Sequence, residues 1–124
     1  MEKEYIRAVN GLIEVGDESF FREDYALAGR SFRKALDAYP LAQSHRERVS
    51  RSPKKLKSNL DACCNTLMEQ GLREYRRGKL EGAISKWKGL LAINPGHTEA
   101  RKALETASVQ LEALQNIEKG QSKR

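Results

Sequence analysis

Residues 67–95 read LMEQGLREYRRGKLEGAISKWKGLLAINP, and this stretch decides the fold of the chain. Apolar or small residues recur every three or four positions in its first half and again in its second half, which is the spacing of one buried stripe on each of two helices. Gly78 separates the stripes and favours a tight turn, because glycine readily takes the left-handed conformation that ends a helix. Pro95 stops the second helix. The sequence therefore predicts two antiparallel helices that cross closely, with Gly71 facing Ala83.

The same unit occurs twice in the chain. When the sequence is shifted against itself by 55 residues, a residue of the same kind falls opposite most landmarks of this stretch. A match of this length indicates an internal repeat in which each copy is one helical hairpin. The aligned pairs are Leu12 and Leu67, Gly16 and Gly71, Phe20 and Tyr75, Tyr25 and Leu80, Ala28 and Ala83, Phe32 and Trp87, Ala35 and Leu90, Leu36 and Leu91, and Pro40 and Pro95.

Both copies resemble tetratricopeptide repeats, whose pattern is a large apolar residue, a small residue four positions later, then an alanine, an aromatic residue and a closing proline. The resemblance covers about 29 residues of each copy. It departs from the family in three respects: the spacing is 55 residues, Leu stands where Trp is common, and Glu23 replaces the turn glycine. The resemblance implies an all-α fold of helical hairpin repeats, an α-α superhelix with five main helices.

The expected organisation is a single domain over residues 1–118. Its parts are repeat units at about 9–40 and 64–95, a basic insertion at 41–60, and a helix at 97–118 that caps the last repeat, as in tetratricopeptide proteins. Residues 119–124 have no apolar partner and are expected to be a disordered tail.

Three polar residues are predicted to start helices. Asp24 and Thr98 are suitable N-caps, because a short polar side chain accepts a free amide of the first turn. Ser52 followed by Pro53 marks the start of a long helix that continues into the second repeat. Residues 41–51, before it, are either a short helical turn or a mobile loop.

The net charge of +6 comes mostly from the insertion. Residues 41–60 carry +5, against −2 for residues 1–40 and +3 for residues 61–124. Such a patch attracts nucleic acid, acidic lipid or an acidic protein. It contains no aromatic residue to stack on a base, and a solvated loop is the simpler interpretation. The basic patch consists of Arg46, Arg48, Arg51, Lys54, Lys55 and Lys57.

The residue types that catalysis needs are not gathered in this sequence. His45 and His97 stand apart from any cysteine or carboxylate cluster with metal-ligand spacing. Cys63 and Cys64 are neighbours on one helix with side chains about 100° apart, so they are expected to be small core residues in a reducing setting. No glycine-rich phosphate loop or serine elbow is present. We therefore expect no catalytic residue, no metal and no cofactor.

The expected function is that of a protein-interaction scaffold. The resemblance implies that the first helix of each pair lines a concave groove, which receives a peptide or helix of another protein. Two alternatives remain. One is a basic adaptor that docks on nucleic acid or an anionic surface through residues 46–57. The other is a self-association module such as a homodimer, because two repeats are fewer than the three usually needed to bury a continuous core. The expected groove residues are Asn10, Ile13, Glu14, Asp17, Phe21, Asn65, Met68, Glu69, Leu72, Arg76, Lys102, Thr106 and Val109.

The sequence also bears on location. No apolar run approaches the roughly 20 residues needed to span a bilayer. The first residues lack the basic-then-apolar order of a signal peptide. We therefore expect a cytoplasmic protein whose partner is another protein and not nucleic acid, or a cell-envelope location if the sequence belongs to a longer chain.

Overall fold

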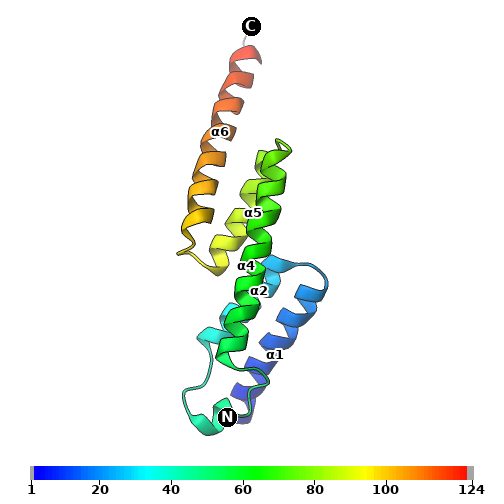
Figure 1. The fold of residues 1–124 in the computed structure, drawn as a ribbon, viewed down its shortest axis with the longest axis vertical. Helices are drawn as coiled ribbons and strands as arrows, with labels where there is room; N and C mark the ends of the chain where they lie inside the picture. Colours follow the sequence, from blue (N-terminus) through cyan, green and yellow to red (C-terminus); the bar gives the residue numbers. More distant parts are fainter. Residues whose placement is uncertain (1, 123–124) are drawn as a thin grey trace. The chain divides into compact units, whose positions relative to one another are not determined.

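The computed structural model describes residues 2–122, and these residues form helices joined by short connections (Figure 1). Over this range no strand is present, which confirms the all-α prediction. Helices number six here and not five, because one additional turn forms in the insertion. They are α1 (Glu2–Phe21), α2 (Tyr25–Asp37), α3 (Gln43–Arg46), α4 (Pro53–Arg76), α5 (Leu80–Ile93) and α6 (Thr98–Ser122).

The chain divides into two compact units, and the boundary between them lies inside α4. The first unit ends at Thr66 and the second begins at Leu67. Helices α1 to α3 and the first half of α4 belong to the first unit, while the second half of α4, α5 and α6 belong to the second. The predicted start of α4 is confirmed, since the helix begins at Pro53 and the Lys55 amide donates to Ser52 Oγ at 3.2 Å.

In the first unit, the α1–α2 hairpin closes where Phe32 meets Gly16. A Cβ added at Gly16 would lie 2.5 Å from Cε1 of Phe32, so only glycine allows the ring to rest on the α1 backbone. Phe32 is 1% exposed. The other buried apolar residues of this unit include Ile6, Val9, Ile13, Ala28, Ala35, Leu56, Leu60, Cys63 and Cys64.

The turn between α1 and α2 holds Glu23 in an uncommon backbone conformation. Its φ is 64°, in the left-handed region that L-residues rarely occupy. The predicted cap at Asp24 is confirmed, because Asp24 Oδ1 accepts the Leu27 amide at 3.2 Å. The rings of Phe20 and Tyr25 also meet edge to face, with centroids 5.2 Å apart. The cap and the ring pair hold the turn closed despite the strain at Glu23.

In the second unit, the α4–α5 hairpin closes in the same way. A Cβ at Gly71 would lie 2.6 Å from Cε2 of Trp87, which is 1% exposed and donates from Nε1 to the Met68 carbonyl at 3.4 Å. The predicted pairing of Gly71 with Ala83 did not include this ring. The three heavy atoms nearest to a Cβ at Gly71 belong to Trp87, because its long indole reaches across the crossing, and Ala83 is also fully buried in this hairpin.

Helix α6 packs against α5, with Ala100 and Ala107 fully buried. Its cap differs from the prediction. His97 Nδ1 accepts the Ala100 amide at 3.1 Å, and Thr98 is the first residue of the helix itself. A neutral histidine has an acceptor nitrogen at the reach of an N-cap, and it takes the place that Thr98 was expected to fill.

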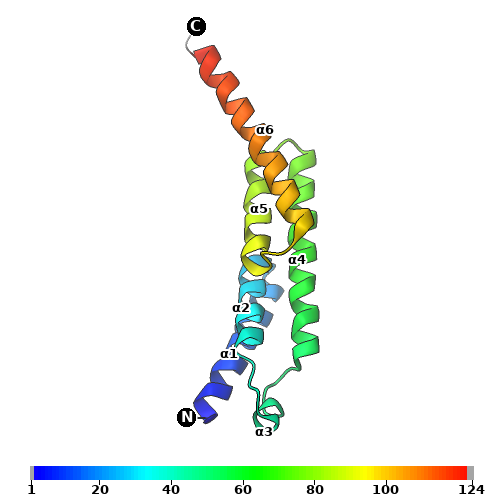
Figure 2. The ribbon, with the colours of Figure 1, turned by 90° about the vertical axis from the view of Figure 1, so that its left-hand side faces the viewer.

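The C-terminal half of α6 extends past the α4–α5 turn (Figures 1 and 2). Residues 112–120 are all exposed. The helix continues to Ser122, past residue 119, where the disordered tail was predicted to begin. No proline interrupts it, and Lys119 in the last turn suits the negative end of the helix dipole. Residues 123 and 124 lie outside the described part of the chain.

Candidate protein-interaction surfaces

The insertion is tied to the face of α1 that was predicted to line the groove. The side-chain amide of Asn10 makes two hydrogen bonds to the backbone of the insertion: Nδ2 donates to the Arg48 carbonyl at 3.3 Å, and Oδ1 accepts from the Ser50 amide at 2.8 Å. Asp17, about two turns further along α1, accepts two bonds from the Arg51 guanidinium at 2.7 and 2.8 Å. Asn10 and Asp17 therefore hold a segment of the same chain.

Arg51 joins several helices of the first unit. Its Nη1 also donates to Asn59 Oδ1 on α4 at 3.1 Å, and its guanidinium lies 6.0 Å from the centre of the Phe32 ring on α2. The hydrogen bonds that Arg51 donates to Asp17 raise the pKa of Arg51, against the opposing effect of partial burial. Arg51 therefore connects helices within the first unit, and its charge is paired with Asp17 and not free to bind a partner.

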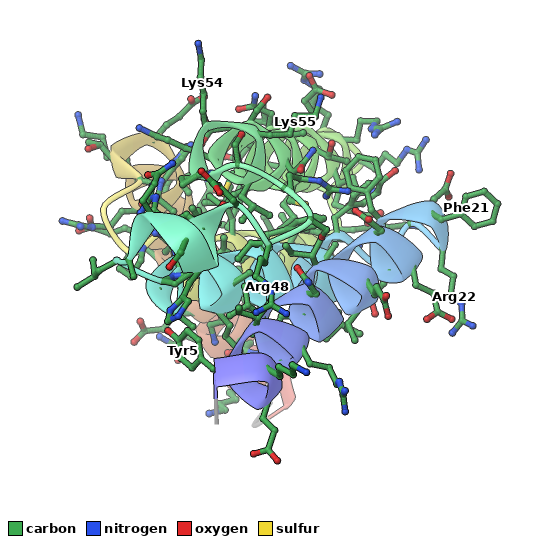
Figure 3. All side chains as sticks on the ribbon, turned by 90° about the horizontal axis from the view of Figure 1, so that it is seen from below. Tyr5, Phe21, Arg22, Arg48, Lys54 and Lys55 are labelled. Carbon is green, nitrogen blue, oxygen red and sulfur yellow. The ribbon has the colours of Figure 1, made fainter. Side chains whose placement is uncertain are left out.

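The remaining groove candidates of the first unit differ in their exposure. Ile13 is 2% exposed and belongs to the core, because the buried stripe of α1 passes through it. Phe21 is 89% exposed, and Figure 3 shows its ring pointing away from the end of α1. Glu14 and Asn65 are exposed. Only the exposed members of this set are accessible to a partner.

The groove candidates of the second unit lie on α4 and α6, and a hydrogen bond joins these two helices. The Tyr75 hydroxyl and Gln110 Oε1 are 2.8 Å apart, which places the end of α4 beside α6. Met68 is 7% exposed and belongs to the core, whereas Val109 is 61% exposed. Leu72 is half-buried and the rest are exposed: Glu69, Arg76, Lys102 and Thr106.

The basic patch does not form one surface. Besides Arg51, Arg46 is also engaged, with its guanidinium 4.9 Å from the centre of the Tyr39 ring and its Nη1 donating to the Pro40 carbonyl at 3.0 Å. Arg48 lies over α1 in Figure 3 and borders a hollow of about 470 Å³, whose other charged residues are Lys3, Arg7 and Glu14.

The three lysines of the patch remain on the solvent side of α4. Lys54, Lys55 and Lys57 are exposed in its first turns, and Figure 3 shows Lys54 pointing outward. The accessible charge of the insertion is therefore smaller than the sequence suggests, because the structure uses two of the three arginines internally.

The two cysteines are buried, as predicted. Burial raises the pKa of the Cys63 thiol to about 12, with a further contribution from Cys64, and raises the pKa of the Cys64 thiol to about 11. Both are therefore protonated and poorly nucleophilic near neutral pH.

Two absences apply to residues 2–122 only. No group of three or more His, Cys, Asp or Glu side chains in this range could hold a metal ion. None of the helices formed there combines the length and apolar character that crossing a bilayer requires.

Sequence reasoning missed a hollow of about 250 Å³ in the α4–α5 hairpin. The sequence does contain a run of polar residues spaced three and four apart on α4. A solvated helix face has the same pattern, so the run does not by itself indicate a hollow. The hollow is lined by Gln70, Arg73, Glu74 and Arg77 of α4 and by Lys86 of α5.

No protein-family model, curated protein or solved structure matches this chain.

Proposed function

We propose that this chain is a non-catalytic interaction module of the tetratricopeptide kind, and that it binds an apolar or helical segment of another protein. Support comes from the like construction of its two hairpins. Each closes an aromatic ring onto a glycine, Phe32 on Gly16 and Trp87 on Gly71. Each turn has a residue with positive φ at the corresponding place, Glu23 in one and Gly78 in the other. The likeness between the two copies thus extends from their sequences to their contacts and backbone geometry.

The surface proposed to receive the partner lies on the second unit. Val109, which is 61% exposed, carries this proposal. It follows exposed Lys102 and Thr106 at the spacing of one helix face, and half-buried Leu72 stands on the neighbouring helix α4. An apolar centre with a polar border is the usual composition of an interaction surface.

In the first unit the corresponding surface of α1 is partly occupied by the insertion. On α1 the corresponding polar residues, Asn10 and Asp17, are engaged by the insertion. A partner would have to displace residues 48–51 to reach them.

The test compares two variants in which an exposed valine becomes aspartate. Val109→Asp places a charge at the centre of the proposed surface, whereas Val15→Asp changes a 44% exposed valine of α1. A purified partner identified by capture with the wild-type chain should bind the Val15→Asp variant normally and the Val109→Asp variant at least tenfold more weakly. Equal binding by both variants would refute the assigned surface.

Two further measurements separate the alternative functions: the salt dependence of the same titration, and the molecular mass of the chain alone. Binding that falls steeply with added salt and is lost on neutralising Lys54, Lys55 and Lys57 would instead support the basic adaptor. A molecular mass that doubles with concentration, measured without any partner, would support self-association. An apolar interface predicts neither result.

A further inference from the structure

The hollow in the α4–α5 hairpin is lined by charged and polar side chains alone. Arg73, Arg77 and Lys86 supply three positive charges, Glu74 supplies one negative charge, and Gln70 supplies an amide. The hairpin is the part of the second unit joined by the turn near Gly78 (Figure 1).

The backbone of α5 makes room for this arrangement. The α4 residues are spaced three and four apart, so they share one side of that helix. On the facing helix stands Gly82, where an added Cβ would lie 2.9 Å from Glu74 Oε2. The absence of a side chain at position 82 thus allows the Glu74 carboxylate to rest against α5.

The charged groups of the hollow are not satisfied by one another. Within residues 2–122, no ion pair is formed by Arg73, Glu74, Arg77 or Lys86, although all four border the same space. The two arginines are exposed, while Glu74 and Lys86 are half-buried. Each therefore keeps its hydrogen-bonding capacity for another molecule.

Gln70 provides a second and independent indication. Its Oε1 atom is buried and has no hydrogen-bond partner in the described part of the chain. A buried acceptor without a donor destabilises a fold, and such groups call for a specific explanation. A bound molecule that brings an N–H donor would satisfy it.

We propose that this hollow binds an acidic segment of a protein, with an Asp or Glu carboxylate held by Arg73, Arg77 and Lys86. Arginine suits that group because its fork of donors matches both carboxylate oxygens. The backbone N–H groups of the same segment would donate to Gln70 Oε1 and to the Glu74 carboxylate. An acidic peptide carries both the anion and the donors that these five residues require.

The same residues argue against nucleic acid at this place. A phosphate backbone supplies negative charge but no N–H donor of its own, so it would leave Gln70 Oε1 and the Glu74 carboxylate without the donors that a peptide backbone brings. No aromatic side chain lines the hollow to stack on a base. The proposal is independent of the surface assigned around Val109, and no variant in its test changes Val109 or Leu72.

The experiment titrates the whole chain with an acetylated tetraglutamate peptide and follows the backbone amides by NMR. Saturable shifts are expected at residues 70–77 and 82–86. Lys86→Gln should weaken binding about fivefold or more, because it removes a charge-assisted contact, and Arg77→Gln should act similarly. Lys88→Gln is the matched control, since it removes the same charge from an exposed residue of the same helix. Equal weakening by Lys86→Gln and Lys88→Gln would show general charge attraction and overturn the site.

A Gln70→Met variant distinguishes a binding role from a structural one. The substitution keeps the length of the side chain and removes the unpaired carbonyl. The melting temperature should stay the same or rise, while peptide affinity falls about threefold or more. Unchanged affinity would remove Gln70 from the site. A decathymidylate that competes with the peptide, binds more tightly and depends on Lys86 would replace the acidic segment with nucleic acid as the ligand.

Discussion

The indole ring of Trp87 lies on the backbone of Gly71, so closely that a Cβ at that position would come within 2.6 Å of Cε2. Fifty-five positions earlier, Phe32 lies on Gly16 with a corresponding distance of 2.5 Å to Cε1. Each hairpin thus joins its helices through an aromatic ring placed over a glycine. The largest buried side chains of the two units are the rings in these two contacts.

Replacing Gly71 with alanine should destabilise the second unit. The methyl group would overlap the indole, and overpacking of this kind costs about 1 to 3 kcal/mol. Urea unfolding followed by circular dichroism measures the change. Gly11→Ala is the control, because nothing lies within 4 Å of a Cβ at position 11. It should stabilise α1 by about 0.5 to 1 kcal/mol through helix propensity. Similar effects from both variants would contradict the contact with Trp87.

Lys79→Asp should stabilise the second hairpin by about 1 kcal/mol. Lys79 occupies the N-cap of α5 without a side-chain hydrogen bond, whereas Asp24 caps α2 at the corresponding place of the first hairpin. Lys79→Ala removes the same positive charge from the helix N-terminus but adds no acceptor, so it separates the dipole effect from the cap. The expected order of unfolding midpoints is Asp, then Ala, then Lys; an Ala variant equal to the Asp variant would exclude a capping contribution.

Glu23→Gly should stabilise the first hairpin by about 0.5 to 1 kcal/mol. An L-residue in the left-handed region costs about 1 to 2 kcal/mol, and part of this gain is offset by the greater freedom of glycine in the unfolded chain. The φ values of 64° at Glu23 and 75° at Gly78 show that the two turns require the same conformation. Gly78→Glu is the reciprocal variant and should lower the thermal midpoint. A loss of stability in the Glu23→Gly variant would indicate that the Glu23 side chain contributes a contact of its own.

The helices and their hairpin pairing could be predicted from the sequence because they depend on local signals. The apolar spacing gave the faces of α1, α2, α4 and α5, and Pro53 and Gly78 marked where a helix begins and where one ends. The contact partner of Gly71 could not be predicted in the same way. Spacing identifies a face, but the reach of a long side chain such as Trp87 decides which residue on that face makes the contact.

The attachment of the insertion to α1 could not be predicted from local sequence patterns. Its attachment depends on Asn10 meeting Ser50 and on Asp17 meeting Arg51, which are 40 and 34 positions apart in the chain. The hollow near Lys86 was missed for a similar reason, because it combines residues of two helices with the absence of a side chain at Gly82. The cap at His97 was missed because Thr98, the commoner capping residue, stands next to it.

Arg51→Lys should loosen the insertion from α1. Lysine cannot donate both bonds to Asp17 while also reaching Asn59, and the fork of arginine does so here. Because the pair is partly exposed, the expected loss in unfolding free energy is about 1 kcal/mol or less. Hydrogen exchange offers the more sensitive measurement, and the Ser50 amide should exchange faster. Arg48→Lys, at an exposed position without an ion pair in the described residues, should leave that exchange rate unchanged.

The two thiols should make the first unit less stable in alkaline solution. Their pKa values of about 12 for Cys63 and about 11 for Cys64 lie above the ordinary 9.0, so the folded chain retains protons that the unfolded chain has released. Their contribution is complete below about pH 9 and is lost as the pH rises through 11 and 12. Urea unfolding as a function of pH should show this decline, and the Cys63→Ala, Cys64→Ala double variant should show a shallower one. Parallel curves would mean that the thiols ionise alike in both states.

Helix α4 runs without interruption from Pro53 to Arg76, across the boundary at Thr66. The loop before α4 is not a suitable point for recombination between repeats, because a break there would remove buried Leu56 and Leu60 from the first unit. The turn after it cannot serve either, since a cut at Gly78 would take Gly71 away from Trp87. Arrays of separate repeats gain and lose members by exchange at their loops, but recombination at either of these connections would damage a core. We therefore expect the two hairpins to be inherited together, as one indivisible block of sequence.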